Sequence, residues 1–423
     1  MLDIKFIKDN PERIKENIKK RFQEQKIPLV DKVIKNYDSW LELKKEAEEL
    51  RHKRNVISEK INLLKKHSKD ASSELKQVKE IPEKIKKLEE KQDRLDQEIK
   101  KDLMLIPNII HPSVPIGRDD SQNVEIKKIG KPKKFSYEIK NHAELVEKLG
   151  LADFDSAAEI SGKGFYILKG KLAMLDMALI NFARDYMLKQ GFEYIHAPYM
   201  IKKRVVEGVM SFKEMENMMY KIEGEDLYLI GTSEHPMIGM FINKTLKKDE
   251  LPIKITGFSP CFRKEIGSHG IDEKGLFRVH QFHKQEMIVI CEPKDSYKWY
   301  DKMLKFTVDI FKQLEIPTRV LEICSGDLAD LKAKSCDVEA WSPRQNKYFE
   351  VGSLTNMEEA QARRLGIKIQ GDDGKYYAHT LNNTVLATSR AMVAILENHQ
   401  QKDGAIKIPK ALQKYIGGLK EIK

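Results

Sequence analysis

A charged and aromatic segment in the middle of the chain, Phe258 to Glu286, carries side chains that suit chemistry on a phosphate. Two alternating apolar runs flank a polar loop, Gly267 to Gly275, and this pattern predicts an antiparallel hairpin. Residues two apart share a face of a strand, so Arg263 and Glu265 should point the same way. The return strand should present a matching face made of His280, Phe282, Lys284 and Glu286. One surface would then hold a guanidinium, carboxylates and an aromatic ring, which indicates a site.

The side chains of this face favour binding of a nucleotide and an amine. A guanidinium binds two phosphate oxygens at once, a phenyl ring stacks on a nucleobase, and carboxylates suit an ammonium group. From composition alone, an ordinary exposed hairpin is an equal alternative. The sequence FRKE, followed by a loop and the second strand RVHQFHKQE, resembles motif 2 of class II aminoacyl-tRNA synthetases, in the form found in seryl-tRNA synthetases.

Length, charge and cysteine content limit the class of protein. The 423 residues exceed one average domain, so two or three units are expected. Lys and Arg number 76 against 65 acidic residues, a net charge of +11 that permits a polyanionic partner without establishing one. The four cysteines form no CxxC pair and predict reduced thiols. No apolar run approaches the roughly 20 residues of a membrane span, and the N-terminus lacks a targeting pattern. We therefore expect a cytoplasmic protein with no membrane contact.

The first hundred residues have helical periodicity. Asn10-Pro11 predicts the start of a helix that runs to about Gln23. A long helical stretch follows Pro28, and a polar break at residues 67–73 separates it from a second stretch. The second stretch has a seam in steps of three and four, formed by Val78, Ile81, Ile85, Leu88, Gln92, Leu95 and Ile99. The pattern predicts an antiparallel helical hairpin with legs of about 30 residues, about 45 Å long. Pro82 should kink or delay the second helix.

Two functions fit this predicted hairpin. Periodicity alone favours a dimerisation coiled coil over a nucleic-acid-binding arm, and the basic faces fit either. The segment LIPNIIHPSVPIG that follows is similar to the linker after the arm of seryl-tRNA synthetases. The resemblance implies a tRNA-binding arm with its linker at residues 1–112 and a catalytic domain at residues 113–423. It also implies that the arm binds the long variable region of tRNA-Ser.

Three further segments are similar to parts of the same family. Residues 171–201 predict a helix and a strand, which is either a plain core unit or the dimer-forming motif 1, and motif 1 implies a homodimer. The tripeptide Thr232-Ser233-Glu234 resembles the serine-binding TxE loop, although a lone TxE is more often a helix cap. Arg390 begins an apolar helix and resembles the motif 3 arginine that faces ATP, although such an arginine is usually only solvated.

The strand predicted at Tyr348 to Ser353 carries the candidate metal ligands. The resemblance implies that Glu350 and Ser353 hold Mg²⁺ against the ATP phosphates, and oxygen ligands with few protein contacts suit that ion. Gly352 stands where serine is common in the family, and residues 359–364 lack the usual aromatic residue. These two departures leave the local packing open.

The resemblance covers the whole chain, which is identified as a member of the seryl-tRNA synthetase family of the common type. The zinc-dependent form is a poor match, because no cysteine-based site is evident. The implied fold is α+β, with an N-terminal antiparallel helical hairpin and a class II catalytic domain built on a mostly antiparallel sheet flanked by helices. The implied activity is the activation of L-serine with ATP and Mg²⁺, followed by transfer to tRNA-Ser, with tRNA-Sec as a further acceptor to be tested.

The resemblance also implies the site residues. Arg263, on the α-phosphate, and Arg390, on the β- and γ-phosphates, would be the catalytic residues. The implied ATP site comprises Arg263, Lys264, Glu265, Val279, His280, Gln281, Phe282, Glu350, Val351, Gly352, Ser353 and Arg390. The implied serine site comprises Thr232, Ser233, Glu234, Arg263, Glu286, Asn382 and Thr384.

Within the implied site, each substrate group has its own partners. Phe282 should stack on adenine, and Glu265 should contact the adenine amino group. The serine hydroxyl should bind Glu286 and Thr384, while the loop of residues 232–234 should lie near the ammonium. A pocket that hydrogen-bonds a hydroxyl strongly rejects alanine, since its buried polar groups would be left unpaired, and threonine must be excluded by size.

Two other functions remain open from the sequence. One is a relative that activates an amino acid and loads a non-tRNA acceptor, which would catalyse serine-dependent pyrophosphate exchange without charging tRNA. The other is a structural or nucleic-acid-binding coiled-coil protein with a degenerate second domain, which would show no exchange.

Overall fold

The computed structural model describes residues 1–265 and 275–423 of the chain. Of the polar loop predicted at Gly267 to Gly275, all but the last residue lies outside the described residues. The chain forms two compact units, Met1–Pro107 and Asn108–Lys423. No helix in the described ranges is long and apolar enough to cross a membrane.

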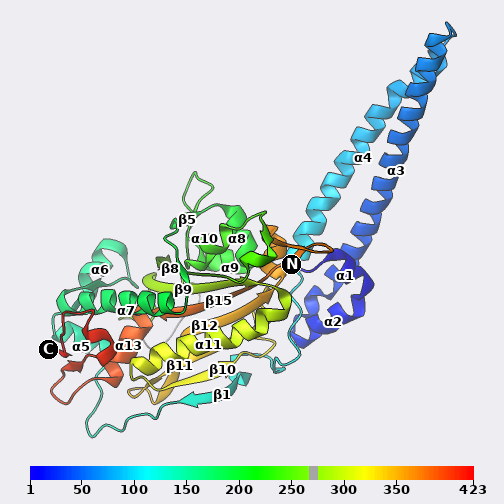
Figure 1. Ribbon diagram of the computed structural model, residues 1–423. Coiled ribbons are helices and arrows are strands. Elements are labelled where there is room, and N and C mark those ends of the chain that lie inside the picture. The colour runs from blue at the N-terminus through cyan, green and yellow to red at the C-terminus, as the bar shows by residue number, and fades with distance from the viewer. Residues whose placement is uncertain (266–274) are drawn as a thin grey trace. The chain divides into compact units, whose positions relative to one another are not determined.

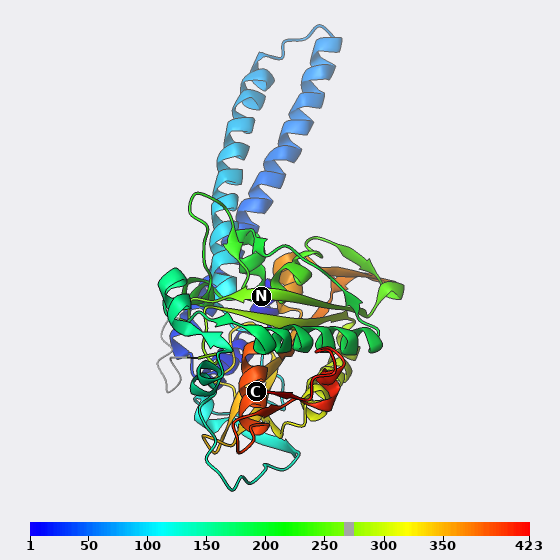
Figure 2. The ribbon, with the colours of Figure 1, turned by 90° about the vertical axis from the view of Figure 1, so that its left-hand side faces the viewer.

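The first unit is helical, as predicted. Two short helices, α1 (Ile4–Asp9) and α2 (Pro11–Lys20), precede α3 (Ile27–Lys66) and α4 (Ser72–Leu105). Figure 1 and Figure 2 both show α3 and α4 side by side along their length, which confirms the antiparallel hairpin. The legs have 40 and 34 residues, so they are about 60 Å and about 51 Å long at 1.5 Å per residue and exceed the predicted length.

Apolar side chains at the predicted steps hold the two long helices together. Ile57 and Ile61 of α3 are buried in one cluster with Ile81 and Ile85 of α4. The prediction that Pro82 delays the second helix is wrong, because α4 begins ten residues earlier. Its start is supported locally by an aspartate, Asp70, whose carboxylate accepts hydrogen bonds from the Ser72 backbone N–H at 3.0 Å and from the Ser72 hydroxyl at 2.6 Å.

An eight-stranded sheet forms the centre of the second unit, with strand order β1-β10-β11-β12-β15-β9-β8-β4. Its strands are β1 (Val124–Ile129), β4 (Glu193–Tyr194), β8 (Ile253–Phe262), β9 (Gln281–Cys291), β10 (Thr318–Glu322), β11 (Lys334–Ser342), β12 (Lys347–Glu358) and β15 (His379–Ala387). Every pair of neighbours is antiparallel except β4 with β8, so the predicted mostly antiparallel sheet is confirmed.

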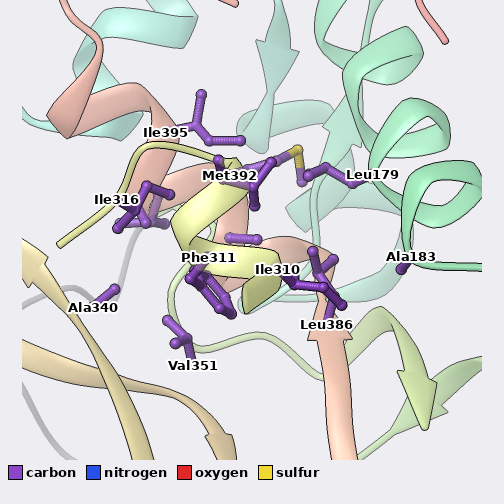
Figure 3. Packing of buried hydrophobic residues seen from close by; sticks show 14 of the residues in the cluster. Leu179, Ala183, Ile310, Phe311, Ile316, Ala340, Val351, Leu386, Met392 and Ile395 are labelled. Carbon is purple, nitrogen blue, oxygen red and sulfur yellow. The ribbon is translucent and has the colours of Figure 1, made fainter. Parts of the chain in front are cut away.

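Three longer helices, α7 (Gly170–Lys189), α11 (Ser296–Gln313) and α13 (Thr388–Asn398), pack against this sheet. Figure 3 shows part of the core that they form, where Leu179, Phe311 and Met392 lie near Val351 and Leu386 of the sheet.

The shorter helices are α5 (His142–Lys148), α6 (Phe154–Ser161), α8 (Lys203–Val209), α9 (Phe212–Met218), α10 (Glu234–Gly239), α12 (Ala360–Leu365) and α14 (Lys410–Gln413). The minor strands are β2 (Ala152–Asp153), β3 (Ile167–Leu168), β5 (Met200–Ile201), β6 (Tyr228–Leu229), β7 (Thr245–Lys247), β13 (Lys368–Gly371), β14 (Gly374–Tyr377), β16 (Ile406–Lys407) and β17 (Glu421–Ile422).

Alternation along β9 decides which side chains reach the site. Met287 and Val289 belong to the core under α7, α11 and α13, while Ile288 and Ile290 belong to a second core that includes residues of α8, α10 and α12. Even-numbered residues of β9 therefore share the face of the second core. Phe282, Lys284 and Glu286 lie on that face, as the sequence predicted.

The β8–β9 hairpin ends earlier than the sequence predicted. β8 ends at Phe262 and β9 begins at Gln281, so Arg263, Glu265 and His280 lie beyond the strands. One further backbone hydrogen bond, from Arg263 N–H to the His280 carbonyl at 2.9 Å, extends the pairing. Glu265 then adopts a left-handed conformation with φ of 49°, which ends the alternation on which the prediction rested.

Candidate active site

An open cavity lies at the ends of β8 and β9, beside β12, β15 and the start of α13. It is lined by nine of the predicted residues, namely Arg263, Glu265, Val279, Phe282, Glu350, Val351, Gly352, Thr384 and Arg390. Five further residues line it that are absent from the implied ligand sets, namely Phe277, Arg278, Lys284, Ala387 and Ser389, although the sequence placed Lys284 on the same strand face. Segments more than a hundred residues apart in the chain thus share one cavity.

The charged side chains of the cavity are mainly cationic. Four cations, Arg263, Arg278, Lys284 and Arg390, face two carboxylates, those of Glu265 and Glu350. Guanidinium groups suit the paired oxygens of phosphates, and an excess of cations in a concave surface attracts a polyanion. The cavity therefore suits a nucleotide triphosphate better than a neutral ligand.

Arg390 is held at the start of α13, as predicted. Its Nη1 donates to the Glu350 backbone carbonyl at 2.9 Å and to Glu350 Oε2 at 2.9 Å. Its guanidinium carbon lies 5.4 Å from the centre of the Phe277 ring. Burial alone would raise the pKa of Glu350, but the guanidinium of Arg390, and to a lesser degree that of Arg263, keeps this pKa below its usual value. Glu350 therefore stays ionised beside the two arginines.

Arg263 is fixed by a backbone carbonyl and by an aromatic ring. Its Nε donates to the Gly231 carbonyl at 3.2 Å, and its guanidinium carbon lies 5.2 Å from the centre of the Phe282 ring. A cation over a ring face is attracted by the ring quadrupole. These contacts place the guanidinium and the phenyl ring together in the cavity.

Four predicted ATP-binding residues, Lys264, His280, Gln281 and Ser353, are not among the residues that line the cavity. The His280 ring lies 5.3 Å from the Phe165 ring, and its Nδ1 is 2.9 Å from the Arg263 carbonyl, so it supports the backbone of Arg263. His280 lies one residue before β9 and does not line the cavity, so the expectation that its ring shares the site face with Phe282 stays a prediction.

Glu286 lies next to the cavity, at the centre of a buried polar cluster, and is 3 % exposed. Its Oε1 accepts hydrogen bonds from the hydroxyls of Thr232 at 3.0 Å and Thr384 at 3.5 Å, and it also contacts the Lys284 ammonium. Its Oε2 is buried without a hydrogen-bond partner among the described residues. A buried carboxylate oxygen needs a donor, so Oε2 can accept a hydrogen bond from a small hydroxylated ligand.

Glu234, at the start of α10, belongs to a neighbouring part of the same cluster. Its Oε1 accepts hydrogen bonds from Gln361 Nε2 at 2.8 Å and Asn382 Nδ2 at 3.0 Å. The Thr380 hydroxyl donates to Gln361 Oε1 at 2.8 Å and so orients that amide. Asn382 and Glu234, both predicted to bind serine, thus contact each other, whereas Gln361 was not assigned to the site.

Ser233 does not point into this cluster. Its hydroxyl donates to the Gly257 carbonyl of β8 at 2.8 Å, and the residue is 1 % exposed. The side chain therefore secures the loop of residues 232–234 to the sheet.

Three residues of the site, Lys284, Gln361 and Arg278, are absent from the ligand sets implied by the sequence, and they differ in how strongly a local sequence pattern indicates them. Lys284 occupies the predicted face between Phe282 and Glu286, so alternation alone places it beside them. Gln361 carries no such signal, because it reaches Glu234 across 127 residues of sequence. Arg278 precedes β9 and lies outside any periodic pattern.

The predicted Mg²⁺ ligands fit a cation that binds together with a phosphate. Ser353 is opposite Asp337 in the sheet and hydrogen-bonds to it. Burial, and next the Glu350 charge, raise the pKa of Asp337 to about 7. Within the described ranges, no group of three or more His, Cys, Asp or Glu side chains is arranged to hold a metal ion. Mg²⁺ commonly needs only one or two protein carboxylates when phosphate and water supply the remaining ligands. Glu350, which lines the cavity, suits that mode, whereas Ser353 does not line the cavity.

The family resemblance implies that Glu234 lies near the ammonium of serine, and on that assignment we expect the KM for serine to depend on pH. Burial, and next the Glu286 charge, raise the pKa of Glu234 to about 7. Only the ionised carboxylate attracts an ammonium, so the KM for serine should rise as the pH falls below about 7, by up to about tenfold per pH unit. Steady-state measurements between pH 5.5 and 8.5 check this.

The Glu234→Gln variant is the control for that profile. It should bind serine weakly, with a KM that changes little over the same pH range. The same raised pKa makes the folded state hold the proton more tightly than the unfolded one, so Glu234 should lower stability as the pH rises from about 4.5 to about 7. A KM for serine that is flat across pH 7 in the unaltered protein would contradict this assignment.

Comparison with known proteins gives consistent matches over the whole chain. The family model for the seryl-tRNA synthetase N-terminal domain matches residues 1–110, and that for the tRNA synthetase class II core domain (G, H, P, S and T) matches residues 217–399. A serine–tRNA ligase of Methanocella arvoryzae is 45 % identical over 422 residues, which is 99 % of each chain.

Two solved structures are similar in fold. A crystal structure of seryl-tRNA synthetase from Pyrococcus horikoshii complexed with ATP gives a TM-score of 0.94 at 44 % identity and covers 100 % of this chain and 99 % of that chain. A cytoplasmic serine–tRNA ligase from Naegleria fowleri in complex with AMP gives a TM-score of 0.89 at 34 % identity with the same coverage.

Proposed function

Because the chain belongs to the seryl-tRNA synthetase family, we propose that it activates L-serine with ATP and transfers the seryl group to tRNA-Ser. The observation that carries the proposal is the junction of a cationic cavity with the buried Glu286 cluster, in which Oε2 has no hydrogen-bond partner among the described residues. One part suits a triphosphate, and the other suits a hydroxylated amino acid. The similar Pyrococcus structure holds ATP.

In the first step, a carboxylate oxygen of serine attacks the α-phosphorus of ATP. The bond from that phosphorus to the bridging oxygen of the β-phosphate breaks, and pyrophosphate leaves. The serine carboxylate is already ionised, so positioning and charge neutralisation matter more than a general base. We assign Arg263 to the α-phosphate and Arg390 to the β- and γ-phosphates. Glu350 and Ser353 would hold Mg²⁺, which when bound neutralises phosphate charge.

The amino acid and the base are assigned to different walls. Glu286 and Thr384 would bind the serine hydroxyl, and Thr232 and Glu234 would lie near the ammonium. Phe282 would stack on adenine and Glu265 would contact its amino group. Alanine would leave the buried carboxylate of Glu286 without its donor, which is a strong basis for rejection.

In the second step, a terminal hydroxyl of tRNA attacks the carbonyl carbon of seryl-adenylate. The bond to the phosphate oxygen breaks, AMP leaves, and the seryl ester forms. We assign tRNA-Ser binding to the arm and its linker, residues 1–112, and catalysis to residues 113–423. The long variable region of tRNA-Ser would lie against α3 and α4.

We also propose a cytoplasmic homodimer that pairs through α7, the helix similar to motif 1. Met174, Met177 and Leu188 of α7 are 51 %, 52 % and 46 % exposed. The side chains of Met174 and Met177 lie three residues apart on one face of the helix, and a second copy would cover them.

The function is tested by amino-acid-dependent ATP–pyrophosphate exchange with each of the twenty amino acids, followed by charging of purified tRNA-Ser. Serine alone is expected to support fast exchange. We further expect a variant in which a short glycine-serine turn replaces residues 52–88 to retain exchange within about twofold while kcat/KM for tRNA-Ser falls by at least about a hundredfold, because most phosphate contacts of the arm would be lost. The cut leaves the Arg51–Glu89 ion pair of 2.6 Å at the new end of the hairpin.

The controls are the unaltered protein and a variant in which the same glycine-serine turn replaces residues 67–71, the natural α3–α4 connection, and leaves both helices intact. Exchange without any charging by the unaltered protein would favour a non-tRNA acceptor. Charging that survives the deletion would overturn the role of the arm. Purified tRNA-Sec in the same assay tests the second acceptor.

A further inference from the structure

His142 is a buried histidine that none of the steps above uses. It is the first residue of α5 and is 0 % exposed. Its Nε2 accepts a hydrogen bond from the backbone N–H of Leu276 at 3.2 Å. An accepting Nε2 carries no proton, so the ring proton lies on Nδ1. Nδ1 faces Glu397 Oε1 at 3.9 Å, too far for a direct hydrogen bond.

The two neighbours of His142 lie on two segments whose other residues line the cavity. Leu276 directly precedes Phe277, Arg278 and Val279, all three of which line the cavity. Glu397 lies on α13, the helix that presents Arg390 at its start. The imidazole thus lies between the segment that follows the hairpin loop and the helix that carries the second arginine.

The contacts around this imidazole are close and specific. A Cβ at Gly275 would lie 2.5 Å from His142 Nε2, and Gly275 has φ of +129°, so glycine is required there on both grounds. On the other side, Glu397 is held by the Ser342 hydroxyl and by Arg344 Nε at 3.1 Å. The backbone beside His142 and its acidic neighbour therefore both have fixed positions.

We propose that His142 is a positioning residue for the ATP site. By accepting the Leu276 N–H, it fixes the backbone from which Phe277 supports the guanidinium of Arg390 and from which Arg278 and Val279 reach the cavity. His142 touches neither substrate. The inference rests on the ATP site proposed above, and it predicts a defect in the KM for ATP that serine binding does not share.

The test compares His142→Gln with His142→Asn in serine-dependent pyrophosphate exchange. The glutamine amide can reach the position of Nε2 and accept the Leu276 N–H, whereas the asparagine amide reaches only the position of Nδ1. We expect His142→Asn to raise the KM for ATP about tenfold, because a buried N–H left without an acceptor is costly. His142→Gln should stay within about threefold of the unaltered protein, and the KM for serine should stay within about twofold in both.

Leu145→Ala provides a matched structural control, because Leu145 lies on the same helix, is 1 % exposed and packs in the same core. It should lower the Tm while leaving the KM for ATP unchanged. Equal defects in His142→Gln and His142→Asn, or a lowered Tm with an unchanged KM for ATP in His142→Asn, would overturn the inference. Arg390→Ala in the same assay separates the two proposals: if it has no effect on the KM for ATP or on kcat, the ATP site itself is misplaced.

Discussion

Replacement of Arg390 by alanine is expected to lower kcat/KM for ATP in serine-dependent pyrophosphate exchange by about a thousandfold. The guanidinium lies at the start of α13, where the positive end of the helix adds to its charge. Without it, Glu350 would face the phosphates as an uncompensated anion, since Arg390 is the main partner that keeps the pKa of Glu350 low. Exchange rates at saturating serine, measured across ATP concentrations, check the prediction.

Arg319→Ala is a matched control for Arg390→Ala. Both arginines have side chains 27 % exposed and pair with carboxylates, and Arg319 pairs with Glu339 at 2.5 Å and Glu125 at 3.3 Å. Arg319 does not line the cavity, so its loss should leave kcat/KM for ATP within about twofold. Arg390→Lys should fall between the two, because it keeps the charge but not the planar fork. Retention of more than a tenth of the activity by Arg390→Ala would contradict its assignment to the phosphates.

Helical spacing and strand alternation in the sequence correctly predicted the parts of the molecule whose structure is set by residues close together in the chain. The steps of three and four between Ile81, Ile85 and Leu88 predicted the helical hairpin, and all three side chains are buried. Alternation along β9 predicted that Phe282 and Glu286 face the same side. Both patterns follow from the geometry of one element, so they require no knowledge of tertiary structure.

Local patterns failed where the backbone leaves regular geometry. Glu265 was predicted to continue a strand, but β8 ends at Phe262 and Glu265 adopts a left-handed conformation, although it still lines the same cavity as Arg263. No residue type in FRKE signals that change, because glutamate seldom adopts positive φ.

Long-range register explains the remaining surprises. Gln361 and Asn382 both bind Glu234, from 127 and 148 residues away, only because α12 and β15 meet α10 in the folded unit. Packing also explains why Gly352 stands where serine is common in the family. A Cβ there would lie 3.1 Å from Thr307 Cγ2 on α11, so serine would require Thr307 to move. Neither contact can be read from periodicity.

Replacement of Glu286 by alanine is expected to reduce kcat/KM for serine by about a thousandfold, with a much smaller change in the KM for ATP. The variant loses the acceptor for the serine hydroxyl and also the partner of Thr232 and Thr384. It further leaves the Lys284 ammonium, 6 % exposed, without its carboxylate, which should lower the free energy of unfolding by about 3–5 kcal/mol. Exchange kinetics and thermal unfolding measure the two effects separately.

The double variant Lys284→Met/Glu286→Ala distinguishes the two roles of Glu286. Removing both members of a buried ion pair leaves no uncompensated charge, so much of the lost stability should return. Serine activation should not return with it, because the hydroxyl acceptor is still absent. The Lys284→Met variant alone measures how far kcat/KM for serine falls when only the Lys284 cation is removed, and this value is the baseline. Recovery of kcat/KM for serine to that baseline in the double variant would show that Glu286 serves only as the counter-ion of Lys284, and the serine pocket would then have to lie elsewhere.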